Sequence, residues 1–271
     1  MGDTPGGCRD GFMLSFLLTL GLFQRLLQSF LEGLLGGSLA LFPQDVALGF
    51  SSPLFFQAFV VLAWLACVGG LSEALRRSGY GPEITRKVVH IGAGHVILIA
   101  WWLVVPAWTG IAASVAFSFV ALLSYRFPIL PGINSVGRKS LGTFFYALSI
   151  GLLIIWFWPI AQPQYAAIGI LTMTWGDGLA ALVGQRFGAH PYQIWGEKKS
   201  LEGSLTMLAA SYVMCAGILL WVQGPIEATW LIAGIAAMTA TALESVSKYG
   251  VDNLSVPMGT AAVCFWLAQV L

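Results

Sequence analysis

The segment QYAAIGILTMTWGDGLAAL, residues 164–182, contains a single charged residue, Asp177, near its end. A helix needs about 20 predominantly apolar residues to cross the hydrocarbon core of a bilayer. The segment is therefore predicted to span a membrane as a helix, with Asp177 at the end of the span. Gly176 and Gly178 flank this carboxylate, and because glycine has no Cβ atom they allow another backbone or a ligand to come close.

Apolar segments of similar length recur along most of the chain, which has 271 residues. Hydrophobic residues make up 58% of it and charged residues 9%, whereas a soluble domain has roughly 25% charged residues. So few charges cannot cover a soluble globule of this size, and the mean hydropathy is +0.82. We expect an all-α, polytopic membrane helix bundle. The other predicted spans are 54–71, 88–105, 107–123, 141–158, 201–222, 226–243 and 254–271.

The first 50 residues form a separate N-terminal part, ahead of a membrane-embedded domain over 51–271. Residues 12–35 are apolar enough to span a membrane, but polar side chains recur at helical spacing in their second half. An interfacial helix, a ninth span and a cleaved signal peptide all fit this pattern. The first two are favoured, because the apolar stretch is too long for an ordinary signal peptide. The chain is thus predicted to have eight or nine transmembrane helices.

The basic residues lie almost entirely in alternate connections. The connections 72–87, 124–140, 183–200 and 244–253 hold 11 of the 13 Lys and Arg residues, and the others are nearly uncharged. If the spans alternate in direction, all four charged connections lie on one face. The positive-inside rule makes that face cytoplasmic, or stromal in an organelle. No basic tract suggests binding to nucleic acid.

Charged groups are missing from the middle of the predicted spans, where ion-coupled transporters need them. This favours an enzyme working at the membrane surface over a transporter. One candidate site is Lys198, Lys199 and Ser200, directly before the span 201–222. Free N–H groups at a helix N-terminus, next to lysines, suit a phosphate. The alternative is structural: the two lysines set the membrane topology, and Ser200 caps the helix N-terminus. Glu202 could then simply interact favourably with the helix dipole.

Acidic residues gather in the last charged connection. Glu244, Asp252 and Asn253 would lie on the same face as Asp177, and three carboxylates with an amide could hold Mg²⁺ together with substrate phosphates. The alternative is an ordinary polar loop. Arg86 and Lys87 open the span 88–105. His90 shares a helical face with Arg86, and it could bind phosphate, shuttle a proton or lie at the interface as a histidine without a role.

Four segments, read together, resemble the polyprenol kinase family and within it the phytol kinases of photosynthetic organisms. They are Arg86-Lys-Val-Val-His90, Gly176-Asp-Gly-Leu-Ala-Ala-Leu-Val-Gly184, Lys198-Lys-Ser-Leu-Glu-Gly-Ser204 and Glu244-Ser followed by Val251-Asp-Asn-Leu-Ser-Val-Pro257. The resemblance covers the chain from about residue 55 to its end. It implies phosphoryl transfer from CTP to a long isoprenoid alcohol, namely phytol or geranylgeraniol, in phytol salvage towards tocopherol.

The resemblance gives the candidate residues their expected roles. Asp177, Glu244 and Asp252 would bind Mg²⁺ or accept the alcohol proton. The residues expected to hold the nucleotide and its phosphates are Arg86, Lys87, His90, Lys198, Lys199, Ser200, Glu202 and Asn253. Many relatives have a second acid four residues after the Gly-Asp-Gly aspartate, where this chain has Ala181. The alternatives are a farnesol or dolichol kinase, a cytidylyltransferase resembling CDP-diacylglycerol synthase and, less favoured, a transporter.

Overall fold

The computed structural model describes residues 53–127 and 141–271. Residues 57–271 form one compact unit, and residues 1–56 form another, of which only 53–56 are described. The predictions for residues 1–50, including the helix over 12–35, fall outside the described residues. The same holds for most of the charged connection 124–140.

The described residues confirm the all-α prediction, and the predicted spans match the helices to within a few residues at most ends. The helices are α3 (Pro53–Arg77), α4 (Pro82–Gly94), α5 (Val96–Trp102), α6 (Ala107–Ser124), α8 (Gly142–Phe157), α9 (Pro163–Phe187), α10 (Leu201–Gln223), α11 (Glu227–Val246) and α12 (Asp252–Val270). Two short antiparallel strands, β1 (Pro191–Ile194) and β2 (Glu197–Ser200), form a hairpin between α9 and α10.

Three predictions about these elements need correction. The predicted span 88–105 is not one helix, because it begins at Pro82 and breaks at His95 into α4 and α5. The connection 183–200 is not a loop, because α9 continues to Phe187 and the hairpin fills the remainder. Asp177 is therefore not at the end of its helix, but almost three turns before it.

Five of the described helices are long and apolar enough to cross a membrane: α3 (from Leu54), α6, α9, α10 and α11. The helix α8 is apolar but shorter. A multi-pass membrane protein is thus supported, with fewer clear spans in the described residues than the sequence predicts.

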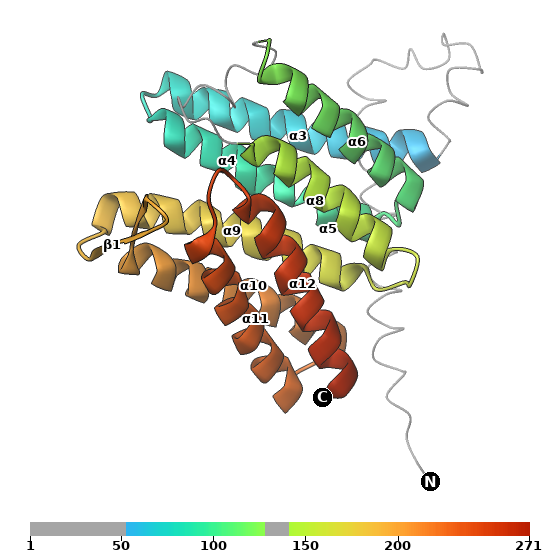
Figure 1. Ribbon diagram of the computed structural model, residues 1–271. Coiled ribbons are helices and arrows are strands. Elements are labelled where there is room, and N and C mark those ends of the chain that lie inside the picture. Colours follow the sequence, from blue (N-terminus) through green and yellow to red (C-terminus); the bar gives the residue numbers. More distant parts are fainter. Residues whose placement is uncertain (1–52, 128–140) are drawn as a thin grey trace. The chain divides into compact units, whose positions relative to one another are not determined.

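The helix α9 forms the centre of the bundle and packs against α4, α8, α10 and α12 (Figure 1). Most of its apolar window is buried. Glycines permit this close packing: a Cβ atom at Gly169 would collide with the Pro257 carbonyl of α12, and one at Gly178 would come within 2.7 Å of Ile91 in α4. The glycines beside Asp177 therefore serve contact between helices, as small residues do in membrane bundles.

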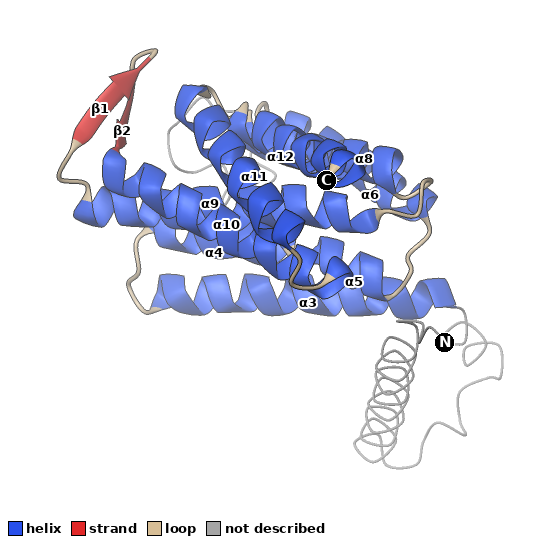
Figure 2. Ribbon diagram, turned by 90° about the horizontal axis from the view of Figure 1, so that it is seen from below, coloured by secondary structure: helices blue, strands red, loops and turns tan. Residues whose placement is uncertain are grey.

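The charged connections that the structure describes lie together at one end of the bundle. Lys248, between α11 and α12, donates a hydrogen bond to the Trp195 carbonyl at the hairpin turn, 3.0 Å away. The amide of Leu141, at the start of α8, donates to the Tyr249 carbonyl. At the other end, the Trp158 indole donates to Val105. The hairpin projects from the end where α9 stops and α10 begins (Figure 2), as the alternation of charge predicts.

Candidate active site

A buried ion pair joins α4 to α9. The Lys87 ammonium lies 2.6 Å from Asp177 Oδ2 and also donates to the Asp177 carbonyl, 3.2 Å away. The Lys87 side chain is 3% exposed and the Asp177 side chain 18%. Because a buried charge without a partner is strongly destabilising, each residue requires the other. The prediction that Lys87 binds phosphate stays untested, and in the structure its ammonium is engaged with Asp177.

His90 approaches the same carboxylate from α4. Its Nε2 atom lies 3.5 Å from Asp177 Oδ2, is buried, and forms no hydrogen bond. The Tyr146 hydroxyl of α8 donates to the His90 carbonyl, and the two rings lie 4.9 Å apart. Lys87 and His90 thus both contact Oδ2, and no side chain in the described residues contacts Oδ1. Among the described residues, the second oxygen of Asp177 thus has no hydrogen-bond or ion-pair partner.

The α4–α5 break separates the two histidines of this region. His95 stands at the break, where its Nδ1 atom pairs with the Ile91 carbonyl at 2.9 Å. The Trp175 indole donates to its Nε2 atom at 3.4 Å. His95 is therefore held by Trp175 of α9, while His90 faces Asp177.

A second ion pair connects the hairpin to α11. The Lys199 ammonium lies 2.6 Å from Glu244 Oε1 and also bonds the Glu244 carbonyl oxygen. Both side chains are mostly buried, at 17% and 13% exposed. Alternate residues of a strand face opposite sides, so the neighbouring Lys198 is exposed to solvent. The Tyr192 hydroxyl of β1 also lies 2.6 Å from the Ser204 hydroxyl of α10, and this hydrogen bond connects the hairpin to that helix.

Asp252 is the first residue of α12 and precedes the predicted span 254–271. Its carboxylate interacts electrostatically with four groups brought from other elements, namely Asp177, Lys87, Lys199 and Glu244. Burial and the neighbouring Asp177 carboxylate raise the pKa of Asp252 to about 6. Within residues 53–127 and 141–271 it has no ion-pair partner. A carboxylate in this setting favours an added cation.

The structure brings most of the predicted site residues into one charged cluster. Its members are Arg86, Lys87, His90, Asp177, Lys199, Glu244 and Asp252. Arg86 pairs with Glu83 at 2.6 Å and interacts with Asp177 and Asp252. Helices α4, α9, α11 and α12 and strand β2 all contribute to the cluster. Residues far apart in sequence thus meet at the charged end of the bundle.

Three of the predicted residues have local partners instead. Ser200 is the N-cap of α10, since its hydroxyl accepts a hydrogen bond from the Gly203 amide. Glu202 binds His190 through contacts of 2.6 Å to Nδ1 and 3.2 Å to its amide. The Asn253 side-chain amide donates to the Gly250 carbonyl at 3.4 Å. Their predicted roles in binding the nucleotide remain predictions.

Sequence reasoning missed Glu83, Tyr146 and His190. Tyr146 and His190 contact predicted residues only after the chain has folded, and nothing in their local sequence marks them. Glu83 had a signal, because it stands three residues before Arg86 and in a helix this spacing favours an ion pair, but residues 72–87 were predicted as a connection. All three hold other residues of the site in place.

The donor set of the cluster fits Mg²⁺ in one respect and departs from the prediction in another. Mg²⁺ binds through one or two carboxylates and substrate phosphates, and the Asp177 Oδ1 atom and the Asp252 carboxylate suit this pattern. In the described part of the chain, however, no three His, Cys, Asp or Glu side chains lie close enough together to hold a metal ion. Glu244 is bound by Lys199, and the predicted Mg²⁺ ligands Asp177, Glu244 and Asp252 remain a prediction.

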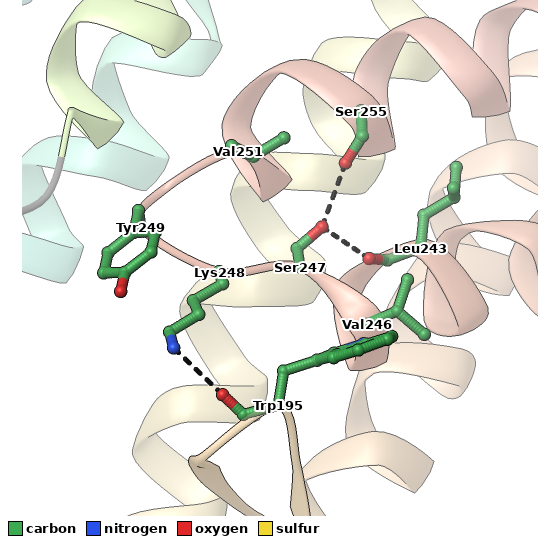
Figure 3. A pocket seen from close by; sticks show the side chains of 8 residues that line it. All are labelled: Trp195, Leu243, Val246, Ser247, Lys248, Tyr249, Val251 and Ser255. Atoms are coloured by element: carbon green, nitrogen blue, oxygen red, sulfur yellow. Dashed lines mark hydrogen bonds between the residues drawn. The ribbon is translucent and has the colours of Figure 1, made fainter.

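A cavity of about 560 Å³ opens beside the charged cluster (Figure 3). It lies between the hairpin turn and the turn that joins α11 to α12. Its lining residues are Trp195, Leu243, Val246, Ser247, Lys248, Tyr249, Val251 and Ser255. Glu244 and Asp252 directly follow two of them in the chain, so the cavity and the cluster are neighbours.

These features define a polytopic membrane protein with a charged site gathered at one end of its helices. The chain belongs to the phytol kinase family. It is 50% identical to a phytol kinase of Synechocystis sp. over 81% of this chain and 94% of the relative. It is 28% identical to a probable chloroplastic phytol kinase of Glycine max, over 74% and 72% of the two chains. The farnesol kinase of Arabidopsis thaliana is 27% identical, over 84% and 78%. No family model matches the chain, and no solved structure does.

Proposed function

We propose that this chain transfers a phosphoryl group from CTP to the hydroxyl of phytol, or of geranylgeraniol, giving a prenyl phosphate for phytol salvage towards tocopherol. The observation that carries the proposal is the 50% identity to the Synechocystis phytol kinase across 94% of that protein. The buried charged cluster around Asp177 and Asp252 supports it independently, since phosphoryl transfer consists mostly of positioning and charge neutralisation.

The proposed topology has eight membrane crossings over residues 51–271, with a ninth if residues 12–35 also span. In this arrangement α4 and α5 together complete one crossing, and α8 and α12 complete two more. The charged cluster faces the cytoplasm or stroma, because the described charged connections meet at one end of the bundle and basic loops stay on that side. The nucleotide then reaches the site from water and the alcohol from lipid.

The proposed reaction moves one phosphoryl group between two oxygens. The phytol hydroxyl oxygen forms a bond to the γ-phosphorus, and the bond from that phosphorus to the β–γ bridging oxygen breaks. CDP leaves with the bond's electrons, and the hydroxyl proton passes to a carboxylate of the cluster. The products are phytyl phosphate and CDP.

Each charged group of the cluster has a place in this reaction. Arg86 and Lys199, with the exposed Lys198, would attract and hold the triphosphate. Lys87 holds the Asp177 carboxylate in place through its 2.6 Å contact. Asp177 and Asp252 would hold Mg²⁺, which when bound neutralises charge on the phosphates. The apolar bundle would take the prenyl tail and leave the hydroxyl at the membrane surface.

The test is a phosphorylation assay on the full chain, purified in detergent or nanodiscs. Labelled [γ-³²P]CTP or ATP is supplied with phytol, geranylgeraniol or farnesol, and the products are separated. We expect labelled phytyl phosphate and unlabelled CDP. A parallel reaction with phosphatidic acid as acceptor tests the cytidylyltransferase alternative, whose products would be a CDP-lipid and pyrophosphate. No transfer to any alcohol by folded protein would contradict the proposal. Farnesol is included because the farnesol kinase relative covers 84% of this chain.

Variants connect the activity to the cluster. Asp177→Asn and Asp252→Asn should each lower kcat by orders of magnitude while the protein still inserts and elutes as a single species. The matched control is Glu73→Gln, which removes an acid of α3 that is partly exposed and pairs with Arg76 and Arg77. The control should keep its activity within about twofold. Full activity in the Asp177→Asn, Asp252→Asn double variant would refute the site.

A further inference from the structure

The cavity beside the charged cluster is open and lined mostly by apolar atoms, and it lies where a small molecule could reach the cluster. Its volume of about 560 Å³ falls in the range of ligand sites, roughly 300–1,000 Å³. Its walls come from the hairpin turn and from the turn between α11 and α12, at the charged end of the bundle. A ligand therefore enters from the aqueous side and not from lipid.

Two aromatic residues line the cavity in costly backbone conformations. Trp195 has φ +52° and is followed by Gly196 at φ +84°, and Tyr249 has φ +57° and is followed by Gly250 at φ +86°. Left-handed backbone is unfavourable for residues other than glycine, asparagine and aspartate, and such strain clusters at ligand sites. Val104 and Ala161 are also left-handed, but neither lines the cavity.

Both strained aromatics leave their rings accessible. Trp195 is 72% exposed and Tyr249 is 62% exposed, so both rings are open to a ligand. The two-residue hairpin turn normally favours Asn-Gly or Asp-Gly. Burial therefore does not account for the tryptophan here, whereas a flat ligand stacked on its indole would.

The Lys248 ammonium lies between the two rings, and the hydroxyls of Ser247 and Ser255 lie nearby on the side of α12 (Figure 3). The Lys248 ammonium bonds the Trp195 carbonyl at 3.0 Å and lies 4.8 Å from the centre of the Tyr249 ring, which joins the two walls. The hydroxyls of Ser247 and Ser255 lie 3.0 Å apart across the α11–α12 turn. Figure 3 shows the indole extending towards Val246, with Lys248 and Ser247 on the side of Tyr249 and Ser255. Aromatic faces with a few hydrogen-bonding groups suit a nucleobase.

The cavity also has the right position relative to the charged cluster. Glu244 lies between the lining residues Leu243 and Val246 on α11, and Asp252 follows the lining residue Val251. Lys199 of β2 is bound to Glu244 and belongs to the same hairpin as Trp195. A molecule with a flat base in the cavity would therefore direct its phosphates towards cationic groups.

We infer that this cavity binds the nucleoside part of the phosphoryl donor, with its base stacked on Trp195 beside Tyr249 and its triphosphate directed to the charged cluster. This inference rests on the proposed kinase function. The alcohol is the other possible occupant, but its apolar chain comes from the bilayer, whereas the cavity opens at the charged end of the bundle.

The test separates binding of the nucleotide from use of the alcohol. Trp195→Ala is compared with wild type and with Phe187→Ala, a control that removes another 62% exposed aromatic at the end of α9. [α-³²P]CTP binding is measured by equilibrium dialysis on the full chain in nanodiscs without added alcohol. The KM values for CTP and for phytol are measured separately. Because Trp195 is exposed, its truncation should leave folding intact, which size-exclusion elution and Tm verify.

We expect Trp195→Ala to raise Kd and KM for CTP about tenfold, the loss of one base–aromatic stacking contact, with the KM for phytol and kcat within about twofold. Tyr249→Phe keeps the aromatic ring and removes only its hydroxyl, so its Kd and KM for CTP should stay close to those of wild type. A rise in the phytol KM alone, or no difference from Phe187→Ala, would overturn the inference. Saturable CTP binding that depends on Trp195, without phosphorylation of any alcohol, would support the nucleoside site while rejecting the proposed function.

Discussion

Replacing Lys87 by methionine tests the buried ion pair between α4 and α9. The substitution shortens the side chain by one atom and removes its charge, so that the Asp177 carboxylate loses its 2.6 Å partner. Lys87 is 2% exposed, and water cannot readily take its place. Breaking a buried pair by removing one partner costs about 3–5 kcal/mol. For a chain of this size, each kcal/mol lowers Tm by about 2–4 °C, so Tm should fall by about 10 °C.

A double variant separates the charge from the packing. Replacing both members of a buried ion pair by neutral groups is often nearly neutral in stability. Lys87→Met with Asp177→Asn should therefore recover most of the lost Tm, although it should remain inactive because the carboxylate is gone. The assay is thermal unfolding of detergent-purified protein, followed by tryptophan fluorescence. Lys198→Met is the matched control, since Lys198 is exposed, and its Tm should not change.

Two results would refute this reasoning. An unchanged Tm in Lys87→Met would mean that the pair is open to water and contributes little. A double variant no more stable than Lys87→Met would mean that the methionine fails to pack, and that the loss is not due to the unpaired carboxylate. Recovery of stability without recovery of phosphorylation is the expected signature of a pair that positions Asp177.

Three further predictions follow from the packing and charges of the same site. Burial raises the pKa of Asp252 from 3.8 to about 6, so its ionisation destabilises the fold as pH rises between these values. Asp252→Asn should therefore be more stable than wild type by up to about 3 kcal/mol at pH 7.5. A difference in Tm between the two proteins that does not shrink towards pH 4 would argue against the shift. Gly169→Ala should cost about 1–3 kcal/mol, because its Cβ would meet the Pro257 carbonyl, whereas Gly234→Ala, with nothing within 4 Å of the added atom, should not lower Tm. Lys199→Met should lower the free energy of unfolding by about 2 kcal/mol. It should also lower kcat/KM at least tenfold, because Glu244 and the hairpin lose the ion pair that holds them together. Wild-type kinetics in this variant would show that the ion pair is dispensable.

The sequence predicted the helices well, because an apolar stretch of about 20 residues has few alternatives to a membrane helix. It also placed Asp177, Glu244 and Asp252 at the same end of the bundle, since alternating spans bring alternate connections together. The break at His95 was not predicted. It falls at His95 after Gly92 and Gly94, in a stretch without proline, and the Trp175 indole donates a hydrogen bond to His95 there.

The pairing of charges could not be read from the sequence. Lys87 and Asp177 are 90 residues apart, and Lys199 is 45 residues from Glu244, so only the packed helices bring them together. The hairpin was missed because its strands have only four residues each, and because its Trp195-Gly196 turn lacks the usual Asn or Asp. Strained turns of this kind arise where surrounding contacts outweigh local preference.

The position of Asp177 inside α9 has a consequence for how the protein is made. Insertion of a helix into the bilayer is opposed by about 2.5–3.5 kcal/mol when an aspartate lies at its centre. Lys87 precedes Asp177 in the chain, so during synthesis α4 emerges from the ribosome before α9. The cation of the pair is therefore synthesised before the carboxylate that it neutralises, and it is available when α9 is inserted.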